Sequence, residues 1–79
     1  MAKANIRRNA LLKDYSMLNG MSRQLLEARN EIVRINKRIM NKVSGPSKPD
    51  LVESLEIVMA HMDRARKELD RSARKLKQI

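Results

Sequence analysis

The stretch LLKDYSMLNGMSRQLLEARNEIVRINKRI, residues 11–39, carries an apolar residue at every seventh position. This column consists of Leu11, Leu18, Leu25, Ile32 and Ile39. Three residues after successive members of the column lie Met21, Ala28 and Ile35, which we expect to complete the same face. Two apolar positions per heptad, kept up along the whole stretch, indicate a long coiled-coil helix over residues 11–43. Gly20 weakens this helix, but the column keeps its phase across it, so we expect no break.

A second repeat of the same kind follows in residues 51–79, where we predict another helix. Its column consists of Leu55, Met62, Leu69 and Leu76. We expect the accompanying positions to be Leu51, Val58, Ala65 and Ile79. Between the two repeats, residues 44–50 read SGPSKPD and form a connector. Gly45 is suited to a left-handed backbone conformation, and the spacing of Ser47 and Asp50 resembles a capping box.

A connector this short makes the two helices antiparallel neighbours, so the fold class that we predict is an all-α, two-helix hairpin. Folding at the connector brings together residues whose numbers sum to about 94. The hairpin seam is then predicted to consist of Leu18, Leu25, Ile32 and Ile39 against Leu55, Met62, Leu69 and Leu76. Residues 1–10 form a basic N-terminal lead-in to the first helix.

The first helix also carries a second apolar column, displaced by about 100 degrees around the helix axis from the first. Its members are Leu12, Leu26, Val33 and Met40. Arg29 and Asn36 lie between the two columns and would need polar partners if they became buried. One antiparallel neighbour does not cover so broad a face, so we predict that these six residues form a partner interface. A second copy or another helical protein would complete a three- or four-helix bundle.

Size and composition point the same way. A chain of 79 residues forms one domain at most, and its core is marginal without further packing. There are no cysteines, one aromatic residue and six methionines, a set suited to helix seams and unsuited to base stacking. No apolar run is long enough to span a membrane. We therefore expect a soluble, intracellular protein, most simply cytoplasmic, with nuclear and mitochondrial locations as alternatives.

The net charge of +9 is distributed unevenly. Residues 29–63 hold six basic and five acidic residues and so carry only +1, whereas the remaining twelve basic and four acidic residues carry +8. In the hairpin this excess gathers at the open end, opposite the connector. The residues predicted to contact an anion there are Arg7, Arg8, Lys13, Arg71, Arg74, Lys75 and Lys77. A nucleic acid and an acidic protein surface both remain candidates, and a solvated surface without a ligand is the structural alternative.

The sequence contains no residue pattern that indicates an active site. The single histidine, His61, has no second ligand at metal-binding spacing, and no nucleophile with a base is present, so we expect no enzyme, no metal site and no cofactor. Glu27 and Glu31 lie within reach of Arg23 and Arg34, which favours ordinary ion pairs.

The predicted hairpin resembles two known protein families in shape. The connector Gly45-Pro46-Ser47-Lys48-Pro49-Asp50-Leu51-Val52 is similar to the hairpin turn of type III secretion needle proteins, but the strongly basic second helix departs from the polar C-terminal helix of that family. The overall plan resembles the Rop family of plasmid copy-number regulators, whose hairpins dimerise to a four-helix bundle and bind RNA. Neither resemblance supplies a shared functional motif.

These observations predict a non-enzymatic structural or adaptor subunit that packs through its first helix against other helices in a larger assembly. The alternative is a hairpin dimer that binds RNA or DNA through its basic open end.

Overall fold

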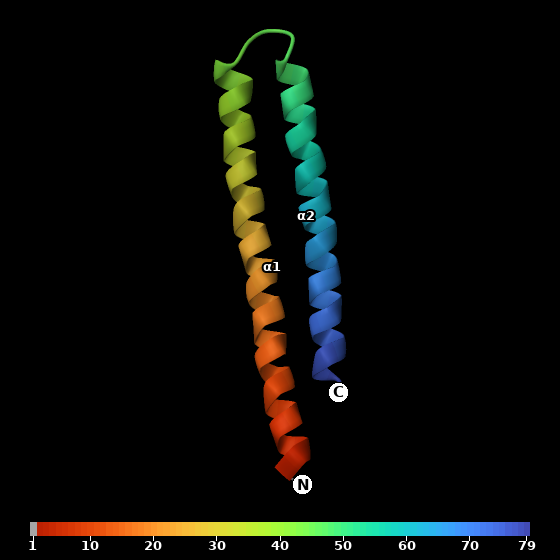
Figure 1. Cartoon of the computed structure of the whole chain (residues 1–79). Helices are drawn as coiled ribbons and strands as arrows, with labels where there is room; N and C mark the ends of the chain where they lie inside the picture. The colour runs from red at the N-terminus through yellow and green to blue at the C-terminus, as the bar shows by residue number, and fades with distance from the viewer. Residues whose placement is uncertain (1) are drawn as a thin grey trace.

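A computed structural model describes the backbone of residues 2–79 and the side-chain surroundings of residues 9–79. It contains two helices, α1 from Ala2 to Lys42 and α2 from Lys48 to Lys77, packed side by side as a hairpin (Figure 1). The molecule is a rod that measures 66 × 15 × 12 Å. The prediction of an all-α antiparallel hairpin is confirmed.

Helix α1 is longer than its apolar repeat suggested, because it begins at Ala2 and takes in the basic lead-in. It runs without interruption through Gly20, as its unbroken column led us to expect. A Cβ atom added at Gly20 would meet nothing within 4 Å, so no close approach of another group requires glycine there. At the N-terminal end, α1 extends beyond the C-terminal end of α2 (Figure 1).

The turn is shorter than the predicted connector, since α1 ends at Lys42 and α2 begins at Lys48. Gly45 adopts a φ of 113°, the positive value that its place in the connector suggested, but it lies in the turn and not directly at the helix end. Lys48 closes the turn by donating from Nζ to the carbonyl oxygen of Met40 over 2.7 Å. A lysine at this site stabilises the negative end of the α1 dipole.

Ser47 differs from the capping-box expectation. Its backbone is helical, with φ −78° and ψ −16°, and its side chain makes no capping hydrogen bond. A capping serine needs an extended backbone to aim its hydroxyl at the first free N–H groups, which explains the difference. Pro49 and Asp50 in the first turn still favour the start of α2 at this point.

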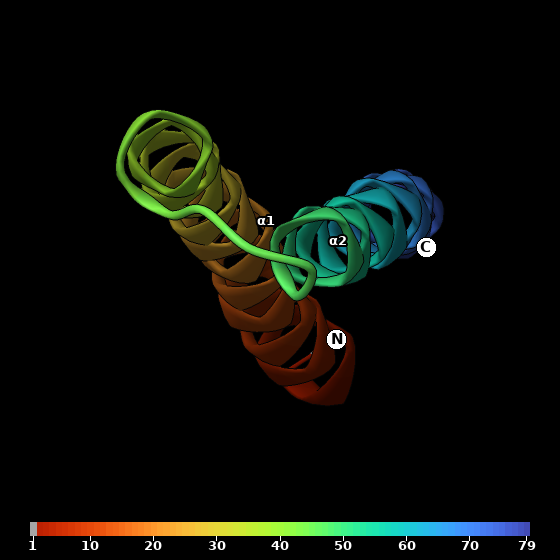
Figure 2. The same cartoon turned by 90° about the horizontal axis from the view of Figure 1, so that it is seen from above.

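The two helix axes wind around each other, so that the direction from α1 to α2 changes along the rod (Figure 2). Among residues 9–79 only two side chains are buried, Ala73 with 2% and Ser22 with 6% of its surface exposed, and no large apolar side chain is fully buried. Both are small residues, and both lie in the half of the hairpin toward its open end. Elsewhere the seam stays half open to solvent.

Candidate interaction surfaces

All eight residues of the predicted hairpin seam are half-buried in the structure. Their accompanying row, however, differs from the expected one. Met21, Ala28 and Ile35 are exposed, and the half-buried or buried row of α1 lies four residues after the column. This row consists of Tyr15, Ser22, Arg29 and Asn36.

In α2, as in α1, the covered row lies four residues after the column and the row three residues after it is exposed. Leu51, Val58, Ala65 and Ile79 are exposed, whereas the row four residues after the α2 column is covered. That row consists of Val52, Met59, Arg66 and Ala73. The covered side of the hairpin therefore combines polar residues of α1 with small or flexible residues of α2.

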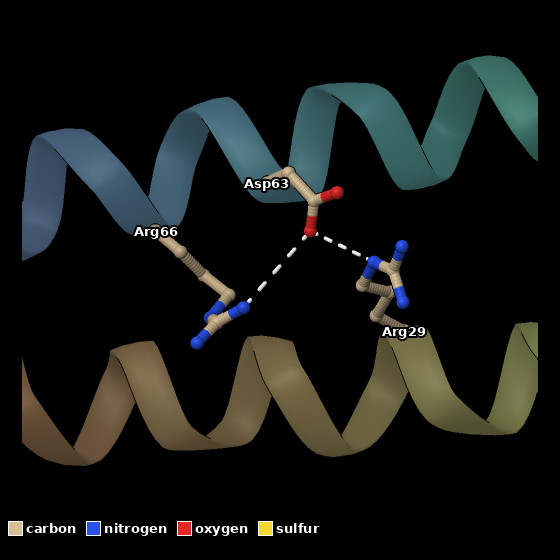
Figure 3. A network of polar contacts seen from close by, with 3 residues as sticks. All are labelled: Arg29, Asp63 and Arg66. Carbon is tan, nitrogen blue, oxygen red and sulfur yellow. Dashed lines mark ion pairs between the residues drawn. The ribbon is translucent and has the colours of Figure 1, made fainter.

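The polar row holds a cross-helix ion pair, in which Nε of Arg29 lies 2.8 Å from Oδ1 of Asp63 (Figure 3). Arg66 approaches the same carboxylate oxygen to 4.0 Å from one turn further along α2. The Arg29 and Asp63 side chains retain 34% and 40% exposure. Solvent screening at that exposure limits the pair to about 0.2–1 kcal/mol, so it orients the helices more than it stabilises them.

Two buried polar atoms have no hydrogen-bond partner among the described residues, Oδ1 of Asn36 in the polar row of α1 and Nε of Arg66 in the covered row of α2. A buried polar group without a partner costs roughly 1–3 kcal/mol, so the row is a poor solution for stability alone. Polar residues in a helix seam instead restrict register and choice of neighbour.

Tyr15 extends the row toward the open end, where Nζ of Lys77 lies 5.4 Å from the centre of its ring. This cation–π contact and the Arg29–Asp63 pair both join residues whose numbers sum to 92. The register of the hairpin is therefore within about two residues of the predicted one.

The predicted partner interface is split by the fold. Leu26 and Val33 are half-buried beside the seam, and Arg29 and Asn36 lie within it. Only Leu12 and Met40 remain broadly exposed, at 50% and 56%. On this side the neighbouring row of α2 contains Glu56, Asp63 and Asp70, so the surface is apolar on one helix and acidic on the other.

The opposite side of the hairpin is apolar on both helices, a feature that the sequence reasoning missed. An antiparallel pair has a local two-fold axis perpendicular to its plane, so rows with the same offset from the two seam columns lie on the same side. We call this surface the shared apolar face. Its members are Met21, Ala28 and Ile35 of α1 with Leu51, Val58 and Ala65 of α2.

The shared apolar face could have been found from the letters alone by asking which flank is apolar on both helices. Its residues were instead assigned to the seam, because an apolar row was preferred to the polar row that carries Arg29 and Asn36. The structure places that polar row inside the hairpin and leaves the apolar row outside.

At the basic open end, Arg71, Arg74, Lys75 and Lys13 are exposed, and Lys77 lies against Tyr15. Arg7 and Arg8 belong to the part of α1 whose side chains lie outside the described residues. The outward side of α2 here carries basic residues at helical spacing with no acidic residue among them. They are Arg64, Lys67, Arg71 and Arg74.

Within residues 9–79 no group of three or more histidine, cysteine or acidic side chains is arranged to hold a metal ion. His61 is exposed. Glu31 pairs with Arg34 one turn away on the same helix. A shallow depression nearby is lined by Gln24, Glu27, Ala28, Asn30, Glu31 and Arg34, all from α1.

In the described part of the chain, neither helix has a segment apolar and long enough to cross a membrane. Comparison with protein-family models, curated proteins and solved structures found no match to this chain.

Proposed function

We propose that this chain is a non-enzymatic structural subunit, a helical hairpin that packs against further helices in a larger protein assembly. The observation that carries the proposal is the absence of any fully buried large side chain among residues 9–79. A hairpin of two helices is thin, and every apolar seam residue keeps contact with water. Further helices laid on the hairpin would remove that apolar surface from water, at about 25 cal/mol per Å².

The shared apolar face is the better of the two docking sides, because both helices supply apolar residues to it. Ile35, Leu51 and Val58 on this face are 37%, 43% and 38% exposed. The side with Leu26 and Val33, which we predicted from the sequence, is apolar only on α1. The neighbouring row of α2 is acidic, so a helix that docked on this side would make apolar contact with α1 alone.

The test compares three variants in a pull-down from the native source, with helix content monitored by circular dichroism. Ile35→Asp with Val58→Asp interrupts the shared apolar face, Leu26→Asp with Val33→Asp interrupts the other side, and Ile57→Asp changes an exposed residue on the outward side of α2. We expect the first variant alone to lose its helical partners. Equal capture by all three folded variants would contradict the proposal.

A second function, binding of RNA or DNA at the open end, is supported by the outward basic stripe of α2. Four positive side chains on one face of the helix can contact the negatively charged phosphates of a nucleic acid, whatever its base sequence. Replacing Lys67, Arg71 and Arg74 with Gln is expected to abolish binding and to flatten its salt dependence. Binding that stays equally tight in the variant would contradict this function.

A further inference from the structure

Net charge is distributed unevenly along the rod. The half next to the turn, residues 29–63, carries a net charge of only +1, whereas the open half carries +8. Of the ten large apolar residues that are exposed among residues 9–79, six lie in the nearly neutral half. Those between residues 29 and 63 are Ile35, Met40, Val43, Leu51, Ile57 and Val58.

We propose that the shared apolar face of the turn half binds a second copy of this chain, related by a two-fold axis that passes close to Ile35 and Val58. The two copies lie antiparallel, so that their turns point in opposite directions and their basic ends are far apart. The proposal rests on the proposed function and names the partner helices as those of an identical chain.

The apolar pattern of α2 is self-complementary about this axis. Leu51 and Ala65 lie seven residues before and after Val58, so antiparallel pairing places Leu51 of one copy against Ala65 of the other. A large residue thus meets a small one on both sides of a central pair of Val58 side chains. Interdigitation of large and small side chains is what close helix packing requires.

The charge pattern at the rim of the face is self-complementary about the same axis. On α1, Glu31 and Arg38 are placed evenly around residue 34 or 35, so each faces the opposite charge in the second copy. On α2, Asp50 and Arg64 lie on the outward side with Ile57 and take no part in this contact.

The charge pattern of α1 is centred on residue 34 or 35 and the apolar pattern of α2 on Val58, and these two centres lie at nearly the same level of the hairpin. The cross-helix contacts of the hairpin join residues whose numbers sum to 92, so residue 35 of α1 lies level with residue 57 of α2. One axis therefore fits both the charged rim of α1 and the apolar row of α2. The other arrangement, with both turns at the same end, would bring two ends of charge +8 together and is disfavoured by repulsion.

Because the chain contains no cysteine, a single introduced cysteine is the only thiol available for cross-linking. In the full-length protein, Val58→Cys places a thiol on the proposed axis, and Ser44→Cys places one in the turn. Under mild oxidation Val58→Cys is expected to give a covalent dimer, because the two Cβ atoms meet within disulfide range, whereas Ser44→Cys is not. Light scattering of the unmodified chain is expected to give twice the mass of 9.2 kDa.

Charge reversal checks the register. Arg38→Glu is expected to weaken the dimer by about tenfold, and Glu31→Arg with Arg38→Glu is expected to restore it, since the pairs are then only exchanged. Lys37→Glu controls for a charge change on the outward side of α1, away from the Glu31–Arg34 pair.

Three results would overturn the proposal: a dimer linked through Ser44→Cys, a monomeric mass, or a mass above that of a dimer. The proposed function fails separately, because it is decided by whether the face variant loses other helical proteins. A monomer that captures such proteins through the shared apolar face refutes the self-association and leaves the structural role standing.

Discussion

Glycine has opposite effects on the stability of this chain at its two positions, Gly20 and Gly45. Gly20 lies inside a helix with open space around it, so a methyl group there meets no other atom. Gly45 lies in the turn with a φ of 113°, a conformation that residues with a Cβ atom rarely adopt.

Gly20→Ala is expected to raise the free energy of unfolding by about 0.5–1 kcal/mol, because alanine restricts the unfolded chain and favours the helix. Gly45→Ala is expected to lower the free energy of unfolding by a similar or larger amount. Urea denaturation at one fixed protein concentration measures both. A loss of stability in Gly20→Ala would show that another group approaches α1 at this position.

Asn36 carries a buried Oδ1 atom without a partner in the half-buried seam. Asn36→Leu is expected to increase the free energy of unfolding by about 1 kcal/mol, because it removes that unpaired group and adds apolar contact. Asn30→Leu, on the exposed side of α1, is the control and is expected to have little effect. No gain from Asn36→Leu would indicate that Oδ1 is satisfied in solution by water or by a second chain.

The two buried side chains among residues 9–79 are both small and lie at about the same level of the hairpin. Ala73 is 2% exposed, and Ser22 of α1 is the other buried residue. A larger side chain at this level has no room unless the helices separate.

Ala73→Leu is therefore expected to lower the free energy of unfolding by about 1–3 kcal/mol, the usual cost of overpacking a tight site. Ala60→Leu adds the same atoms to the exposed side of α2 and is expected to leave stability nearly unchanged. Thermal and urea denaturation followed by circular dichroism at 222 nm distinguish the two. Equal behaviour of both variants would contradict the close packing at Ala73.

The whole molecule is a thin rod that buries little apolar surface on its own. Its stability is therefore expected to depend on association. If a second copy covers the shared apolar face, unfolding is coupled to dissociation, and mass action makes the unfolding temperature depend on concentration. We expect Tm to rise by several degrees when the chain concentration is raised a hundredfold. Val58→Asp is expected to remove this dependence, while Ile57→Asp keeps it. A Tm independent of concentration in the unmodified chain would contradict self-association.

The linear order of residues was enough to predict the hairpin. Sevenfold apolar columns from Leu11 to Ile39 and from Leu55 to Leu76 specify two helices, and the Gly-Pro connector specifies a reversal between them. These are local properties, since periodicity and turn chemistry act over a few residues. The expected register was accurate to about two residues for the same reason, because a short turn leaves little freedom to slide.

Which flank of each column turns inward was decided only by the packed pair. Rows three and four residues after a column lie almost equally far from it on a helix, so periodicity does not distinguish them. The inward row is the one whose residues suit both helices at once: Ser22 and Ala73 allow close approach, and Arg29 finds Asp63 across the seam. That choice, which depends on residues more than thirty positions apart, exposes Ile35 and Val58 and creates the surface on which the proposed association rests.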